Sequence, residues 1–277
     1  MMTPRPERPE NLTGNADLAA TRAVALTVTA IPAFHDNYIW LLHRGDRAVV
    51  VDPGDAAPVA DALAASGLNL DAILITHHHA DHQGGVDALV SACHPAVYGP
   101  AAESITGLTH ALAGDERFAL PRLGDAVRVL AVPGHTRGHI AYLIGDCLFC
   151  GDTLFGAGCG RLFEGTPAQM AASLATVAAL PDATRVYCAH EYTEMNLRFA
   201  AAVEPDNPCV QQRIADAAAT RARGEPTLPS TIALEKATNP FLRCGAPSVI
   251  AAARAHGAAA DDPVSVFTAI RGWRNAF

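Results

Sequence analysis

A histidine-rich loop of sequence Thr-His-His-His-Ala-Asp-His is the segment of the chain best suited to chemistry. Imidazole nitrogens and carboxylate oxygens are donors that suit zinc, iron and manganese, so several of them in one short loop predict a metal site. In an extended stretch, alternate side chains share one side of the backbone, which groups His77, His79 and Asp81. His78 then points away, and a turn at Asp81 brings His82 back toward the others.

Three further candidate ligands each follow a predicted strand, as the histidine-rich loop does: His135, Asp152 and His190. The four strands are expected at 71–76, 127–132, 147–150 and 185–188. Ligands from distant strands converge only if these strands lie side by side, with their loops gathered at one edge. We therefore expect a site that is built on a sheet scaffold.

The complete set of candidate ligands contains five histidines and two carboxylates. A single catalytic zinc takes only three protein ligands and a water molecule. Two divalent ions ~3.5–4 Å apart that share one carboxylate fit this inventory better. We expect two metal ions, zinc in the first place, although iron and manganese suit the same donors.

The remaining elements indicate an α+β protein. Further short β-rich runs are expected at 26–30, 38–43, 48–52 and 140–144. Gly145 and Asp146 would supply the turn of a hairpin. A helix over 58–66 should end at Gly67, which is a favourable C-terminal cap.

The chain is expected to fall into three parts. A proline-rich, charged segment over 1–23 is predicted to be a disordered leader. Residues 24–190 would form the catalytic domain. After that point the sequence consists of alanine-rich helical stretches broken by prolines, so 191–277 is predicted to be a smaller helical, substrate-binding domain.

Composition excludes several classes of partner. The formal net charge of −8 disfavours nucleic acid, because that affinity comes from Lys and Arg neutralising phosphates. The sequence contains no run that approaches the ~20 apolar residues of a membrane span. Seven cysteines are an odd number, which argues against a disulfide framework and for a reducing compartment. We expect a cytoplasmic monomer without nucleic-acid or membrane partners.

Several other cysteines and histidines are expected to play ordinary roles. Cys147 and Cys150 are three residues apart in a predicted strand, so they should face opposite ways and pack as separate thiols. Cys159 lies in a glycine-rich loop with no base evident beside it. Ordinary polar roles are expected for His78, His94, His110 and His139.

This arrangement of ligands after strands resembles the metallo-β-lactamase superfamily. The resemblance implies a four-layer αββα sandwich with its site at one sheet edge. It also implies two sets of metal ligands: His77, His79 and His135 for one ion, and Asp81, His82 and His190 for the other. Asp152 would bridge the two ions, and Asp81 would help to orient the nucleophile, which makes these two carboxylates the catalytic candidates.

Five other segments resemble a narrower family, hydroxyacylglutathione hydrolase or glyoxalase II: 31–38, 151–165, 190–193, 239–243 and 271–274. The resemblance implies a thioesterase that converts S-(2-hydroxyacyl)glutathione, such as S-D-lactoylglutathione, to glutathione and a 2-hydroxy acid, here D-lactate. This is the second step of methylglyoxal detoxification. The positions implied to bind glutathione are Arg161, Tyr192, Arg271 and Arg274. Arginine suits this role because its planar fork pairs with both oxygens of a carboxylate.

The chain departs from the family pattern in two ways. Phe163 stands where the family often has tyrosine, which removes a hydroxyl contact to the peptide. Arg161 and Arg274 stand where lysine is frequent, which preserves charge but changes hydrogen-bond geometry.

Three other functions share parts of this pattern. The chief alternative is a glutathione persulfide dioxygenase with a single iron, although that relative generally lacks a helical C-terminal domain. The second is a metal-dependent nuclease or lactonase of the same fold. A nuclease would be expected to show a basic face, and the acidic balance and the glutathione-type motifs count against this alternative. A structural zinc protein would use cysteine-rich ligands, whereas this ligand set contains none.

Overall fold

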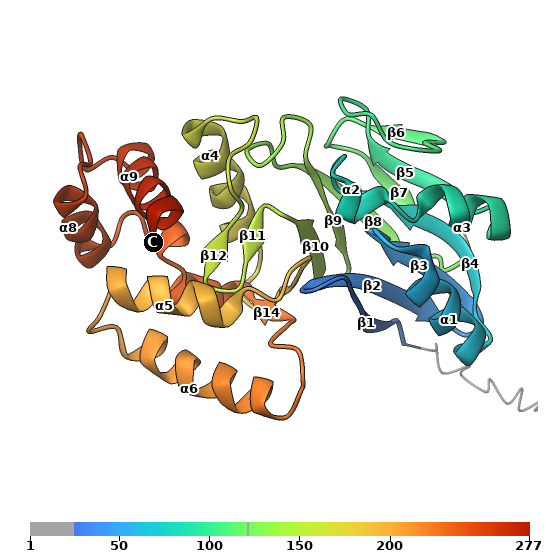
Figure 1. The fold of residues 1–277 in the computed structure, drawn as a ribbon. Coiled ribbons are helices and arrows are strands. Elements are labelled where there is room, and N and C mark those ends of the chain that lie inside the picture. Colours follow the sequence, from blue (N-terminus) through green and yellow to red (C-terminus); the bar gives the residue numbers. More distant parts are fainter. Residues whose placement is uncertain (1–24, 121) are drawn as a thin grey trace, which may run out of the picture.

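The computed structural model of the chain describes residues 25–120 and 122–277. The predicted disordered leader over 1–23 lies outside the described residues. Two six-stranded sheets form the centre of the molecule (Figure 1). The first sheet has the order β1-β2-β3-β4-β5-β6, with bounds β1 Thr27–Ala33, β2 Asn37–Arg44, β3 Arg47–Val51, β4 Asn69–Leu74, β5 Ala96–Pro100 and β6 His110–Leu112.

The second sheet has the order β14-β13-β10-β9-β8-β7. Its strands are β7 Arg117–Ala119, β8 Ala126–Ala131, β9 Ile140–Ile144, β10 Cys147–Gly151, β13 Arg185–Cys188 and β14 Ser230–Thr231. A small two-stranded ribbon pairs β11 Leu154–Phe155 with β12 Gly158–Cys159. All the strands expected from the sequence are present, with bounds that differ by at most a few residues.

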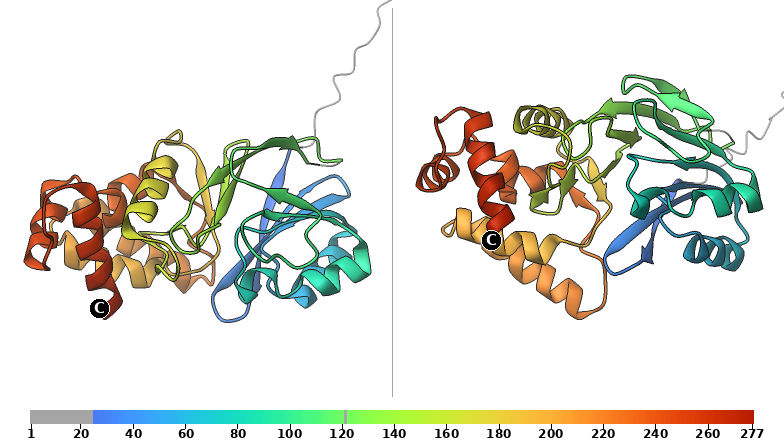
Figure 2. Two further views of the ribbon diagram at one scale, coloured as in Figure 1. Left: turned by 90° about the horizontal axis from the view of Figure 1, so that it is seen from above. Right: turned by 45° about the horizontal axis from the view of Figure 1, so that its top comes forward.

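The helices cover the outer faces of the sheets and one end of the molecule (Figures 1 and 2). They are α1 Ala56–Ser66, α2 Ala80–Gln83, α3 Val86–Cys93, α4 Pro167–Ala178, α5 Thr193–Val203, α6 Pro208–Ala222, α7 Ile232–Thr238, the 3-10 helix η1 Pro240–Leu242, α8 Pro247–Ala255 and α9 Pro263–Ala276. The predicted end of α1 is confirmed, because Gly67 caps it with a φ of 61°, a left-handed conformation that favours glycine. Among the described residues, no helix combines the length and apolar character needed to cross a bilayer.

Strand β2 shows why the chain folds in four layers. Its side chains alternate between two hydrophobic clusters, so both of its faces are buried. Tyr38, Trp40 and Leu42 pack between the two sheets with residues of β8, β9 and β10. Ile39 and Leu41 face the other way and pack in the cluster formed with α1 and α3. The predicted αββα sandwich is confirmed.

The helical C-terminal region is joined to the second sheet. Its short strand β14 pairs antiparallel with β13, placing Ser230 opposite Val186. This strand was not expected from the sequence, because two residues are too few to show alternation. The two views in Figure 2 place α8 and α9 at the end of the molecule away from α1 and α3. A domain boundary near residue 190 stays a prediction.

Candidate metal centre

The structure brings all seven predicted ligands together at one edge of the two sheets. Each follows a strand: the histidine-rich loop follows β4, and the others follow β8, β10 and β13. Three overlapping groups have donor atoms that all lie within 4.8 Å of one another: His77, His79 and His135; Asp81, His82 and His190; and His77, His82 and Asp152. The strand-end placement expected from the sequence is therefore what gathers the donors.

The side chain of Asp152 lies between the first two groups. Its Oδ2 is 3.4 Å from His135 Nε2. Its Oδ1 is 3.5 Å from His82 Nε2 and 3.4 Å from His190 Nε2. One carboxylate thus faces both groups, one oxygen toward each.

The donor atoms are arranged as they would be around cations. His79 Nδ1 lies 3.0 Å from both His77 Nε2 and His135 Nε2, so three ring nitrogens meet at one point. His82 Nε2 and Asp152 Oδ1 are buried without any hydrogen-bond partner. Unpaired buried polar atoms are costly, and a metal ion would satisfy them. The residues present therefore fit divalent metal ions.

The protonation of His135 is set by its surroundings. Its Nδ1 lies 2.8 Å from the carbonyl oxygen of Arg161, which can only accept a hydrogen bond. Nδ1 must therefore carry the hydrogen. Burial lowers the pKa of His135, so the ring is neutral and Nε2 presents a lone pair to the centre. Burial likewise lowers the pKa of His77 and of His79.

In the group of Asp81, His82 and His190, the surroundings raise the pKa of a histidine instead of lowering it. Burial alone would lower the pKa of His190, but hydrogen bonds to Asp152 and Asp81 raise it to about 10. Burial would raise the pKa of Asp152, but the nearby charge of His82 and a hydrogen bond from His190 lower it. The carboxylate of Asp152 is therefore ionised, and a divalent cation beside it would balance its negative charge.

Three residues that the sequence analysis did not single out orient the ligands. Asp52 accepts hydrogen bonds from Thr76 N–H at 2.8 Å and faces His82 Nδ1 at 3.0 Å. Asp36 Oδ1 lies 2.8 Å from His190 Nδ1, and Asn37 donates to Asp81 Oδ2 at 3.0 Å. Such partners fix the tautomer and ring orientation of ligands. Asp52 follows β3 at the same sheet edge, so the rule that found the ligands could have found it too.

The histidines outside the ligand set differ in their roles. His78 points away from the centre, as expected, toward Glu103 and Glu164. The expectation of an ordinary role for His139 was wrong. This side chain is 1% exposed, stacks on the ring of His77 at 4.6 Å, and accepts a hydrogen bond from the backbone N–H of Asp152. Its position was hidden because a lone histidine carries no sequence signal of burial.

The expected geometry of the histidine-rich loop needs one correction. The extended alternation that was to group Asp81 with His77 ends early, because helix α2 begins at Ala80. Asp81 therefore reaches the centre from the first turn of a helix. Gly54 permits this close packing, since a Cβ there would lie 1.9 Å from the carbonyl oxygen of Asp81.

A pocket of about 300 Å³ adjoins the metal centre. The four residues implied to bind glutathione all line it: Arg161, Tyr192, Arg271 and Arg274. Tyr192 joins pocket and centre, because its ring stacks on that of His190 at 4.8 Å. Phe163, which is 61% exposed, lies edge-on to the rings of His79 and His135.

The two C-terminal arginines of this pocket differ in their surroundings. Arg271 is buried, donates to the carbonyl oxygen of Cys159 at 2.8 Å, and has an Nε without a partner. Arg274 is partly buried and donates to Asn196 at 3.4 Å. Burial and the neighbouring charge of Arg271 lower the pKa of Arg274. The repulsion between these two guanidinium groups favours an anion in the pocket.

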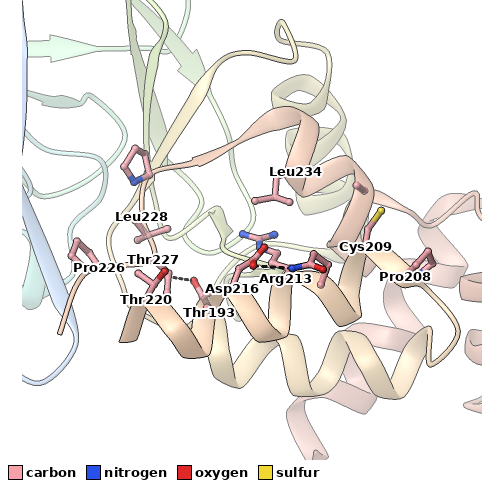
Figure 3. Close-up of a pocket in the computed structure, with 14 residues that line it drawn as sticks. Thr193, Pro208, Cys209, Arg213, Asp216, Thr220, Pro226, Thr227, Leu228 and Leu234 are labelled. Carbon is pink, nitrogen blue, oxygen red and sulfur yellow. Dashed lines mark hydrogen bonds between the residues drawn. The ribbon is translucent and has the colours of Figure 1, made fainter. Parts of the chain in front are cut away.

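A separate pocket of about 500 Å³ lies between α5, α6 and the 226–229 turn (Figure 3). Within the described part of the chain, its lining contains none of the seven candidate ligands. Its arginine, Arg213, is already paired with Glu235 at 2.6 Å. Size alone would favour this pocket over the smaller one, but its described lining residues form no cluster of metal-type ligands.

The seven cysteines are all free thiols. Cys147 and Cys150 are buried separately, as expected, and burial raises the pKa of the Cys147 thiol to about 11. Burial also raises the pKa of Cys159, which lines the smaller pocket. Raised pKa values make these thiols poor nucleophiles.

Comparison with known proteins identifies the family. Residues 33–190 match the metallo-beta-lactamase superfamily, and residues 191–277 match the hydroxyacylglutathione hydrolase C-terminus. A hydroxyacylglutathione hydrolase from Dechloromonas aromatica (strain RCB) is 58% identical over 266 residues, which cover 91% of this chain and 100% of the relative. One from Alkalilimnicola ehrlichii (strain ATCC BAA-1101 / DSM 17681 / MLHE-1) is 60% identical, covering 90% of this chain and 98% of the relative. The chain belongs to the hydroxyacylglutathione hydrolase family.

Solved structures show the same fold. ETHE1 from Myxococcus xanthus has a TM-score of 0.61 and 25% identity, covering 91% of this chain and 99% of that one. The BLEG-1 B3 metallo-beta-lactamase has a TM-score of 0.59 and 24% identity, covering 78% of this chain and 99% of that one. Family membership together with the convergent histidines and aspartates makes this a divalent-metal protein.

Proposed function

We propose that the chain hydrolyses the thioester bond of S-(2-hydroxyacyl)glutathione, with S-D-lactoylglutathione as the representative substrate. The products are glutathione and a 2-hydroxy acid, D-lactate for that substrate, and the reaction is the second step of methylglyoxal detoxification. The observation that carries this proposal is the adjacency of an arginine-lined pocket to a cluster of seven metal-type ligands. Similarity to hydroxyacylglutathione hydrolases over nine-tenths of the chain supports it.

The cluster would hold two divalent ions, in the first place zinc. His77, His79 and His135 would hold one ion, and Asp81, His82 and His190 the other. Asp152 would serve both, since each of its oxygens faces one group. When bound, such ions supply hydroxide near neutral pH and polarise a carbonyl oxygen.

The protein's own residues orient the reaction. Asp81 is held by the amide of Asn37, which fixes its carboxylate beside the centre, where it can orient the attacking water by accepting a hydrogen bond from it. Hydrolysis adds this water to the thioester carbonyl carbon, breaks the C–S bond and releases glutathione thiolate. A thiol with a pKa near ~8.5 leaves with little help from a general acid. This agrees with the absence of an evident acid among the residues described around the pocket.

The pocket would hold the peptide part of the substrate. Glutathione carries two carboxylates, and the paired guanidinium groups of Arg271 and Arg274 suit one of them. Arg161 and Tyr192 line the part of the pocket between these arginines and the centre. Because Phe163 lacks the hydroxyl that the family often has, the peptide must be held mainly by the charged groups.

We also propose that the protein acts as a cytoplasmic monomer. Centre and pocket are assembled from one chain, so no partner is needed to complete them. Seven free thiols are compatible with a reducing compartment.

The alternative of a single-iron glutathione persulfide dioxygenase is less favoured. A single iron would leave the group Asp81, His82 and His190 without a role, although its donor atoms also lie within 4.8 Å of one another. The match of residues 191–277 to the hydroxyacylglutathione hydrolase C-terminus also argues against it.

The experiment is an assay of S-D-lactoylglutathione hydrolysis, followed as loss of thioester absorbance, with elemental analysis of the same preparation. We expect hydrolysis with two metal ions per chain. Oxygen consumption with glutathione persulfide, with one iron and no thioesterase activity, would reverse the assignment.

A further inference from the structure

Glu103 lies outside every candidate ligand group, in the turn that follows β5. Its side chain is only 4% exposed, so its charge is buried. A buried carboxylate is costly unless it is well hydrogen-bonded. The hydrogen bonds of Glu103 therefore indicate which segments this buried carboxylate positions.

Each oxygen of this carboxylate accepts hydrogen bonds from a different loop. Oε2 accepts the backbone N–H of His78 at 2.7 Å and faces His78 Nδ1 at 2.9 Å. Oε1 accepts the hydroxyl of Thr136 and the backbone N–H of Gly138 at 2.9 Å. Four donors thus satisfy the carboxylate, and they come from two segments that are distant in the sequence.

Both loops that Glu103 contacts carry candidate metal ligands. His78 stands between His77 and His79, in the loop that follows β4 of the first sheet. Thr136 directly follows His135, in the loop after β8 of the second sheet. The carboxylate therefore ties the two sheets together within one or two residues of three ligands.

Gln83 strengthens the connection between the Glu103 segment and the histidine-rich loop. Gln83 donates to the carbonyl oxygens of His78 at 2.6 Å and Ser104 at 3.1 Å. It also accepts the backbone N–H of Thr106 at 2.8 Å. The segment that carries Glu103 is thus itself anchored to the histidine-rich loop.

We propose that Glu103 is a positioning residue of the metal centre, which holds His79 and His135 at the separation that one ion requires. The inference rests on the proposed metal ligands and goes beyond them, because Glu103 contacts no ligand side chain of the centre. A carboxylate is required because all four partners at its oxygens are donors. A glutamine amide would replace one of these oxygens by an NH₂ group, which would face donors and could not accept their hydrogen bonds.

The test compares Glu103→Gln with Glu164→Gln, using the full chain loaded with zinc. Glu164 is a matched control, because it also lies beside His78, at 3.4 Å from Nε2, and accepts the backbone N–H of Arg137 at 3.1 Å, but is one-third exposed, so water can replace its contacts. The measurements are zinc affinity in competition with a chromogenic chelator, melting temperature with and without zinc, and kcat and KM. None of the zinc measurements depends on the substrate.

We expect Glu103→Gln to weaken zinc binding by about ten- to a hundredfold, as losses of ligand-orienting partners do. The rise in melting temperature on zinc loading should shrink accordingly. kcat should fall at limiting zinc and recover with excess zinc, whereas KM should stay unchanged. Glu164→Gln should resemble the wild type in all of these.

A purely structural role would lower the melting temperature equally with and without zinc and leave zinc affinity within twofold of the wild type, and that result would overturn the inference. Should Glu103→Gln fail to fold, Thr136→Val removes only one donor and should weaken zinc binding in the same direction. Unchanged zinc affinity in Thr136→Val would then reject the proposal. A wild-type chain that binds zinc but does not hydrolyse the thioester would instead count against the proposed function alone.

Discussion

Asp152 is the residue on which the centre depends most, because its two oxygens face different groups of histidines. A carboxylate in this position neutralises charge in both groups at once. His77 and His82 also belong to two of the convergent groups, but a neutral imidazole presents a single acceptor nitrogen and carries no negative charge.

We predict that Asp152→Ala abolishes thioester hydrolysis and loses at least one metal ion. Elemental analysis after gel filtration and the S-D-lactoylglutathione assay measure both effects. Asp87→Ala, at an exposed carboxylate in the first turn of α3, is the control and should keep metal and activity. Full metal content with normal activity in Asp152→Ala would rule out a shared carboxylate.

A second prediction at the scale of residues concerns Arg274 in the arginine-lined pocket. Arg274→Ala should lower kcat/KM by about ten- to a hundredfold, mainly through KM, since a charge-assisted hydrogen bond contributes ~1.5–3 kcal/mol. Metal content should not change. An alkyl thioester without carboxylates should be hydrolysed equally by variant and wild type. Equal losses on both substrates would show that Arg274 supports the centre or the fold.

Arg271 is a less clean probe of substrate binding. It is buried, bonds to Cys159 and Asn275, and lies over the ring of Phe241 at 5.2 Å. Its removal should therefore lower the melting temperature as well as raise KM, and thermal unfolding separates the two effects.

At the scale of elements, the C-terminal helices are fastened to the ribbon that borders the pocket. Arg213 on α6 pairs with Glu235 on α7 at 2.6 Å, and both side chains are buried. Glu235 also accepts the backbone N–H of Ala157, between β11 and β12. Phe155 and Cys159, one residue from each strand of this ribbon, line the pocket.

Glu235→Ala should destabilise the fold by ~3–5 kcal/mol, because it leaves the charge of Arg213 buried without a partner. Urea unfolding measures the change in free energy. The matched control is Glu225→Ala, which removes a carboxylate paired with Arg223 where both side chains are more than half exposed. That control should unfold like the wild type, since exposed pairs contribute little. An equal response of both variants would show that the buried pair does not anchor the ribbon.

At the scale of the whole molecule, the centre joins the two sheets. His77, His79 and His82 follow a strand of the first sheet, whereas His135 and Asp152 follow strands of the second. Bound metal therefore acts as a link across the open edge of the sandwich, and its binding free energy adds to the stability of the fold.

Removal of metal with a chelator should abolish hydrolysis and lower the melting temperature, and added zinc should restore both. Differential scanning calorimetry with and without chelator measures the shift. If Asp152→Ala has already lost its metal, the same chelator should shift its melting temperature less. A wild-type melting temperature that does not respond to chelation would show that the metal does not link the sheets.

The sequence by itself determined the candidate ligands and the scaffold edge on which they stand. Histidine and carboxylate suit few kinds of chemistry, and their placement after β-rich runs is a local pattern that can be read directly. The end of α1 at Gly67 and the hairpin at Gly145 were predictable for the same reason, since each depends on neighbouring residues only.

The tertiary structure alone decided which other residues serve the centre. Glu103 is a single carboxylate whose partners lie far away in the chain, so no local pattern marks it. The pairing of Asp52 with His82 and of Asp36 with His190 likewise appears only when distant segments meet. The burial of His139 against His77 and the burial of Arg271 at the pocket were also decided by the tertiary structure. Burial depends on which distant segments pack over a residue. The strand β14 exists only because β13 offers an edge for a two-residue segment to pair with.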